Sequence, residues 1–115
     1  MKVIIAGSRD ITDFQLVLPV IERFEGEVAV ISEVVSGGAR GVDALGEKWA
    51  AMRLTPVRRF PADWGTWGPA AGPMRNRQMA EYASGLVLVH TGGKGSASMK
   101  YQAHKLGLKI LEVKL

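Results

Sequence analysis

Three glycine-rich segments of the sequence contain the residue types that bind phosphate groups, at residues 7–10, 36–43 and 91–96. Glycine lets the backbone approach an anion closely, and the free amides at the start of a following helix attract negative charge. Serine hydroxyls and basic side chains in these segments add further bonds. One such segment alone is equally a tight turn, but three together favour a phosphate site. The candidate binding residues here are Gly7, Ser8, Arg9, Ser36, Gly37, Gly38, Ala39, Arg40, Gly41, Asp43, Gly92, Gly93, Lys94, Gly95 and Ser96.

Arg75 and Asn76 are further candidates because they open a predicted helix directly after a Gly-Pro dipeptide. A guanidinium group pairs with phosphate through two parallel hydrogen bonds, and an asparagine amide can address a sugar hydroxyl or a base edge. The alternative for both is an ordinary solvated helix start. Asp43 also has two interpretations, as a structural carboxylate in the first turn of a helix or as a ligand of a ribose hydroxyl.

Two tryptophans, Trp64 and Trp67, lie in a segment rich in glycine and proline, residues 61–73, which we expect to be a long loop. An indole in such a loop could stack on a nucleobase or close over a ligand as a lid. It could equally anchor a minor core or a subunit contact. The sequence does not favour either interpretation over the other.

Other chemistries lack their sequence signatures. The first glycine segment does not match G-x-G-x-x-G, and no G-x-x-x-x-G-K-[ST] phosphate loop occurs. The chain has no cysteine and no recognisable spacing of metal ligands, so we expect no bound metal and no required cofactor. His90 and His104 have no identifiable acid partner or nucleophile, which favours structural roles for both.

Short apolar runs alternate with segments of helical period, the pattern of repeated βα units. Strands are predicted near residues 2–6, 28–35, 56–60, 86–90 and 109–113. A first helix capped by Thr12 or Asp13 is followed by helices near residues 42–52, 74–83 and 96–106. Pro19 predicts a kink in the first helix or a later start, because proline lacks the backbone donor.

Right-handed crossovers with helices on both faces give the strand order 3-2-1-4-5. The sequence therefore predicts an α/β fold, a Rossmann-like doubly wound parallel sheet of five strands. Its order reverses between the first and fourth strands, where ligands bind in such sheets. No repeat or linker interrupts the chain, so residues 1–115 are interpreted as one nucleotide-binding domain.

Composition limits the kind of partner. The 115 residues have a formal net charge of +4, which suits an anionic partner and also an ordinary basic surface. The apolar runs are too short to span a membrane, so a cytoplasmic protein without a membrane partner is expected. A homodimer or higher homo-oligomer is also expected, because small α/β domains often complete their sites in symmetric assemblies.

Five motifs occur in order along nearly the whole chain: Gly-Ser-Arg at residues 7–9, Gly-Gly-Ala-Arg-Gly-Val-Asp at 37–43, Phe-Pro-Ala-Asp-Trp at 60–64, Ala-Gly-Pro-Met-Arg-Asn-Arg at 71–77 and Gly-Gly-Lys-Gly at 92–95. Together they resemble the YspA/YpsA-related SLOG family. Relatives of that family include the DNA-processing protein DprA and the LOG phosphoribohydrolases. The resemblance implies a protein that senses or processes nucleotides or nucleotide-derived ligands.

The last glycine segment departs from the LOG pattern at one residue. The LOG loop, P-G-G-x-G-T-x-x-E, ends in a glutamate implicated in N-glycosidic cleavage, and Met99 stands at that position here. A thioether cannot act as an acid, a base or a stabilising carboxylate. We therefore predict a protein that senses or sequesters a small phosphorylated nucleotide. The alternatives are a nucleotide hydrolase using Glu81, Asp10 or Asp43, and DprA-like binding of single-stranded DNA.

Overall fold

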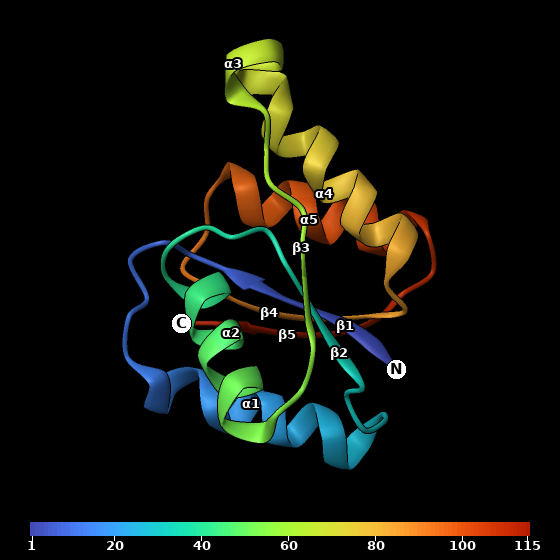
Figure 1. Ribbon diagram of the computed structural model, residues 1–115. Coiled ribbons are helices and arrows are strands. Elements are labelled where there is room, and N and C mark those ends of the chain that lie inside the picture. The colour runs from blue at the N-terminus through green and yellow to red at the C-terminus, as the bar shows by residue number, and fades with distance from the viewer.

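A five-stranded parallel sheet forms the centre of the computed structural model, which describes residues 1–115 (Figure 1). The strand order is β3-β2-β1-β4-β5, and all four adjacent pairs are parallel. The strands are β1 (Lys2–Gly7), β2 (Glu33–Ser36), β3 (Val57–Arg59), β4 (Gly85–His90) and β5 (Lys109–Lys114). The predicted α/β fold and strand order are confirmed.

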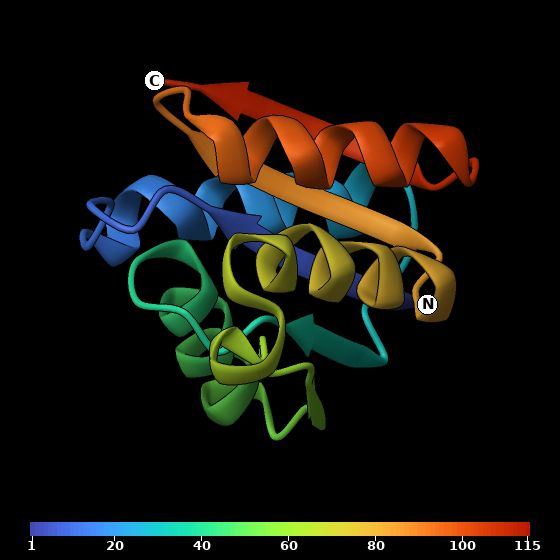
Figure 2. The same cartoon turned by 90° about the horizontal axis from the view of Figure 1, so that it is seen from above.

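The helices are α1 (Phe14–Glu27), α2 (Val42–Arg53), α3 (Trp64–Trp67), η1 (Gly68–Ala70, a 3₁₀ helix), α4 (Ala71–Tyr82) and α5 (Lys94–Lys105). Helices α1 and α2 cover one face of the sheet, while α4 and α5 cover the other (Figure 2). Successive residues of β1 point to opposite faces, so Val3 and Ile5 join the core under α1 and α2. Ile4 joins the second core, under α4 and α5.

Helix α1 begins at Phe14 because Asp13 caps it. The backbone N–H of Gln15 donates to Oδ1 of Asp13 at 2.9 Å. The helix runs through Pro19, so the predicted later start is wrong. Pro19 and Gln15 are both exposed, and solvent can therefore hydrate the Gln15 carbonyl that lacks its usual helical donor.

The predicted long loop at residues 61–73 is wrong for most of its length, since α3, η1 and the first turn of α4 occupy it. Asp63 starts α3 by accepting a 3.1 Å hydrogen bond from the Thr66 N–H. Pro73 lies in the first turn of α4, where a helix needs no backbone donor. Helix α4 therefore begins at Ala71, three residues before the predicted start at Met74, and its first turn sits beside α3 at the top of Figure 1.

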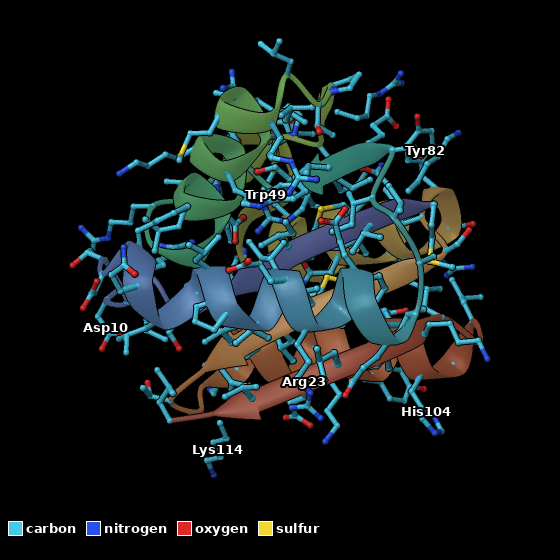
Figure 3. The ribbon with its side chains drawn as sticks, turned by 90° about the horizontal axis from the view of Figure 1, so that it is seen from below. Asp10, Arg23, Trp49, Tyr82, His104 and Lys114 are labelled. Atoms are coloured by element: carbon cyan, nitrogen blue, oxygen red, sulfur yellow. The ribbon has the colours of Figure 1, made fainter.

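Most charged side chains lie on the outside of the layers. Figure 3 shows Arg23 and Lys114 at the surface, whereas Trp49 of α2 lies against the sheet and is 2% exposed. His104, on the last turn of α5, is also exposed. None of the helices is both long and apolar enough to cross a membrane.

Candidate functional site

The loops that follow β1, β2 and β4 meet at the carboxyl edge of the sheet around a cavity of about 370 Å³. The cavity lies where the strand order reverses between β1 and β4, the usual ligand position in such sheets. Its lining consists of Ala6, Gly7, Ser8, Arg9, Asp10, Ala39, Arg40, Asp43, Arg75, Asn76, Met79, Leu88, Thr91, Gly92, Gly95, Ser96 and Met99. Eleven of these residues were site candidates from the sequence.

Ser8 joins the three loops. Its carbonyl accepts a 3.2 Å hydrogen bond from the Val42 N–H, and its hydroxyl oxygen accepts one of 3.0 Å from the Thr91 N–H. Gly41 permits this approach, because it has φ 79° and a Cβ there would lie 2.3 Å from the Ser8 carbonyl oxygen. Gly41 therefore closes the second loop onto the first but does not line the cavity.

The Ser36 hydroxyl is used inside the protein. It donates a 2.6 Å hydrogen bond to Oε2 of Glu47 and accepts one of 3.0 Å from the Gly38 N–H. Ser36 is fully buried and does not line the cavity. Burial raises the pKa of Glu47, but hydrogen bonds from Arg59 and Ser36 and the charge of Arg59 lower it further, so the net shift is downward. Ser36 thus anchors the second loop to a charged Glu47–Arg59 pair.

Asp43 places a buried carboxyl group in the cavity wall, 5% exposed. Its Oδ2 accepts a 3.4 Å hydrogen bond from the Ala39 N–H, so the side chain braces the second loop rather than capping α2. Burial raises its pKa from 3.8 to about 6. The N–H of Ala39 and the charge of Arg75, with the N–H groups of Gly37 and Gly7, oppose that rise. The carboxyl therefore titrates close to neutral pH.

Arg75 reaches from α4 to the second loop. Its Nη1 donates a 2.7 Å hydrogen bond to the Gly37 carbonyl, and its Nε donates one of 3.1 Å to Oδ1 of Asn76. Nη2 has no partner in the protein and belongs to a side chain that lines the cavity. Burial lowers the pKa of Arg75, the charge of Asp43 raises it, and the nearby charge of Arg9 lowers it.

Asn76 is 6% exposed, and its amide is committed to neighbouring groups. Besides accepting from Arg75, it donates through Nδ2 to the Gly95 carbonyl at 3.4 Å and to Oγ of Ser98 at 3.2 Å. Both amide hydrogens are therefore occupied. The side chain ties α4 to the first turn of α5, which is a different role from the base or sugar contact expected from the sequence.

The start of α5 supplies backbone donors to the cavity. Gly92, Gly95 and Ser96 line it, whereas Gly93 and Lys94 do not. The helix has no side-chain cap, so its first N–H groups lack acceptors in the protein. His90 shapes the preceding turn, because its Nδ1 accepts a 3.0 Å hydrogen bond from the Gly92 N–H while its Nε2 contacts Oε2 of Glu112 at 2.6 Å.

A second, more open cavity of about 810 Å³ adjoins the first. It is lined by Arg9, Gly37, Gly38, Ala39, Arg40, Ala44, Glu47, Arg59, Pro61, Ala62, Trp64 and Arg75. Trp67 lines neither cavity. Sequence reasoning missed Glu47 and Arg59. The signal for Arg59 was its position at the end of the third strand, since Ser36 and Arg59 pair in the β2–β3 register.

No group of three or more His, Asp or Glu side chains is placed to hold a metal ion. The site combines backbone donors, serine hydroxyls and guanidinium groups around one buried carboxyl. Such a donor set can hold an anion and one or two hydroxyl groups.

A doubly wound parallel sheet with a polar cavity at its topological switch point defines a Rossmann-like α/β protein. A sequence model of YAcAr, the YspA, cpYpsA-related SLOG family, matches residues 1–67. The chain belongs to this family. It is 33% identical over 85 residues to the Gene 61 protein of Mycobacterium phage D29, an alignment covering 68% of each protein.

The fold is similar to that of a solved structure, DNA processing protein A (DprA) from Streptococcus pneumoniae. The TM-score is 0.75 and the sequence identity is 20%. The match covers 96% of this chain and 49% of the DprA chain. The present chain thus corresponds to about half of that protein.

Proposed function

We propose that the protein binds a small phosphorylated nucleotide, or a ligand derived from one, in the cavity at the switch point, and so senses or sequesters it. The observation that carries this proposal is the cavity's combination of a cationic rim with free backbone donors. Arg9 and Arg75 supply charge, and the first turn of α5 supplies N–H groups. The volume of about 370 Å³ lies within the range of small-ligand sites.

In the proposed mode, the phosphate lies between the start of α5 and the free Nη2 of Arg75. Ser96 is 8% exposed and lines the cavity, so its hydroxyl and N–H can both face the phosphate. Asp43 would then accept a hydrogen bond from a sugar hydroxyl. The apolar side chains of Leu88 and Met99 form the floor under the ligand.

Family membership and fold support nucleotide- or nucleic-acid-related binding as the class of function. Trp64 is the only aromatic residue that lines the two cavities, which favours a small ligand, because a strand of nucleic acid needs an extended groove with several stacking positions. The protein as proposed is cytoplasmic, forms a homo-oligomer and needs no further cofactor.

A second candidate is hydrolysis of the bound nucleotide, and the position of Asp43 favours it. Of the three carboxylates considered from the sequence, Asp10 and Asp43 line the cavity. Glu81 does not, since it pairs with Arg77 at 3.6 Å on the exposed side of α4. Only Asp43 is buried, and a carboxyl with a pKa near 6 can act as a general acid or base near neutral pH.

Calorimetric titration with AMP, GMP, UMP and CMP tests the binding proposal, with each mixture analysed for breakdown products. Arg9→Ala is expected to weaken binding by at least about ten-fold, because a charge-assisted hydrogen bond is worth about 1.5–3 kcal/mol and about 1.4 kcal/mol is a factor of ten. Arg9 is exposed, so the variant should fold normally. Arg77→Ala is the matched control, since Arg77 lies outside both cavities.

The possible outcomes separate the two candidate functions. Binding of an intact nucleotide that is weakened by Arg9→Ala but not by Arg77→Ala supports the sensor. Formation of a free base or phosphate that Asp43→Asn abolishes supports the hydrolase instead. Absence of binding by all four nucleotides, or equal loss in the two arginine variants, would overturn the proposed function.

A further inference from the structure

Three arginines stand where the two cavities meet. Arg9, Arg40 and Arg75 line both cavities. None of them takes part in any of the protein's six ion pairs. Arg9 and Arg75 repel each other, since the charge of Arg9 lowers the pKa of Arg75. A bound anion at the junction would relieve this repulsion, and a group with two phosphates would meet more of the three cations than one phosphate can.

Trp64 forms an aromatic wall in the second cavity. Its indole ring packs edge-on against α4 at Gly72, where an added Cβ would lie 3.0 Å from Cη2 of the ring. The absence of a side chain at Gly72 therefore lets the ring settle onto the helix. Trp64 is still 50% exposed. A ring fixed at one edge and open to solvent elsewhere can stack on a flat ligand group.

The second cavity carries no uncompensated negative charge that would oppose such a ligand. Glu47 is its only acidic residue. The Glu47 carboxylate already accepts hydrogen bonds from Nε of Arg59 at 3.0 Å and from the Ser36 hydroxyl at 2.6 Å. The Glu47–Arg59 pair is neutral overall, so the net positive charge of the wall comes from the three arginines at the junction. The cavity is thus basic with one aromatic face.

We propose that the physiological ligand has two arms joined by a pyrophosphate, one nucleoside in the first cavity and a second aromatic arm stacked on Trp64 in the second. One phosphate keeps the position between the start of α5 and Arg75, and the second faces Arg9 and Arg40 at the junction. This assignment rests on the proposed function, because it extends the same site into the neighbouring cavity. It names the ligand class as a dinucleoside diphosphate or a close relative, rather than a mononucleotide.

The two cavities together set the required shape of the ligand. The first, at about 370 Å³, has room for one nucleoside with its phosphate, while the second adds about 810 Å³ of more open space. A mononucleotide in the first cavity would leave Trp64 without a contact, since Trp64 does not line that cavity. Only a ligand that continues past the arginines reaches the indole.

A ligand series of one base tests the second arm. AMP, ADP and diadenosine diphosphate are titrated in the same buffer, and the corresponding guanosine and uridine series follow. ADP and diadenosine diphosphate have two phosphates each, but ADP carries more negative charge. Charge alone therefore predicts tighter binding of ADP. We expect the two-armed ligand to bind about ten-fold more tightly than ADP, because stacking on an aromatic side chain typically gives that gain.

Two tryptophan variants provide a matched comparison. Trp64 and Trp67 both belong to α3 and are 50% and 55% exposed, but of the two only Trp64 lines the second cavity. Trp64→Ala is expected to abolish the preference, so that the two-armed ligand and ADP bind with about equal affinity. Trp67→Ala is expected to retain that preference. Quenching of tryptophan fluorescence by the two-armed ligand should likewise disappear in Trp64→Ala and persist in Trp67→Ala.

Failure of this inference is distinguishable from failure of the proposed function. If mononucleotides bind but the two-armed ligands bind no more tightly than the diphosphates in every base series, the inference is overturned and the proposed function stands. Equal effects of the two tryptophan variants would also overturn it. If neither mononucleotides nor two-armed ligands bind, both proposals fail.

Discussion

The side-chain amide of Asn76 accepts a 3.1 Å hydrogen bond from Nε of Arg75, its neighbour on α4. The same amide donates to the Gly95 carbonyl and to Oγ of Ser98 on α5. The direction of the Arg75 guanidinium is therefore linked to the contact between two helices. Asn76 acts as a positioning residue, because it orients an arginine that faces the cavity.

Replacement of Asn76 should lower both stability and affinity. Asn76→Ala removes three part-buried hydrogen bonds, and at about 0.5–1.5 kcal/mol net for each bond the expected loss is on the order of 1–3 kcal/mol. Urea unfolding measures that loss. Gln78→Ala, on the exposed side of the same helix, is the control and should change stability by less than about 0.5 kcal/mol. Equal midpoints for the two variants would show that the Asn76 bonds are unimportant.

A side chain at Gly41 should prevent the first two loops from meeting. Gly41→Ala places a Cβ 2.3 Å from the Ser8 carbonyl oxygen at φ 79°, so the backbone must move. We expect destabilisation of more than about 2 kcal/mol, because the clash adds to the cost of the left-handed conformation. Thermal unfolding checks this.

Two other glycines serve as controls for Gly41. Gly38 has φ 71°, and no atom lies within 4 Å of a Cβ added there. Gly38→Ala therefore measures the cost of the left-handed backbone conformation without a clash. Gly26→Ala lies within α1 with open space around it and should stabilise the protein by about 0.5–1 kcal/mol. If Gly41→Ala is no worse than Gly38→Ala, then contact with Ser8 does not require glycine.

The strands and the general position of the site could be predicted because they depend on local patterns. Continuous apolar runs predict β1 and β4, and glycine at strand ends marks the loops. Helix α3 was missed because its only clear signal is the Asp63 cap. Four residues surrounded by glycine and proline have no amphipathic period to reveal them.

Side-chain partners were the part that sequence could not supply. Ser36 looked like a phosphate ligand because it precedes two glycines, but Glu47, eleven residues away on α2, takes its hydroxyl. Asn76 looked free to read a base, yet its partners lie on another helix. Both outcomes depend on which elements pack together, and the spacing of residues along one segment contains no information about that.

Asp43 should make the protein less stable as the pH rises from about 4 to about 6. Its pKa is about 6 in the folded protein and 3.8 ordinarily, so in this range the folded state keeps a proton that the unfolded chain has released. Fewer protons on the unfolded state mean that the free energy of unfolding falls with pH. The total change is on the order of 3 kcal/mol and is nearly complete at about pH 7.

Asp43→Asn removes this titration and provides the measurement. The variant minus wild-type difference in unfolding free energy should rise between about pH 4 and pH 7 and then level off. Carboxylates with lowered pKa values, Glu47 and Glu112, contribute the opposite slope, but they are present in both proteins and cancel. A difference that stays constant with pH would mean that the Asp43 pKa is not raised.

Oligonucleotide length and salt should distinguish a small-ligand site from a binding surface for single-stranded DNA. If one or two phosphates are held at the arginine junction, salt should weaken binding of a nucleotide only modestly, because a single nucleotide carries no condensed counterions to release. Lengthening the probe from two to twelve deoxynucleotides should then add little affinity. A strand-binding surface would instead give rising affinity with length and a logarithmic salt slope of several, because each further phosphate displaces counterions. Fluorescence anisotropy at several salt concentrations makes the comparison.

A steep slope together with length dependence, retained in Arg9→Ala, would place the binding surface outside the cavity and contradict the small-ligand assignment.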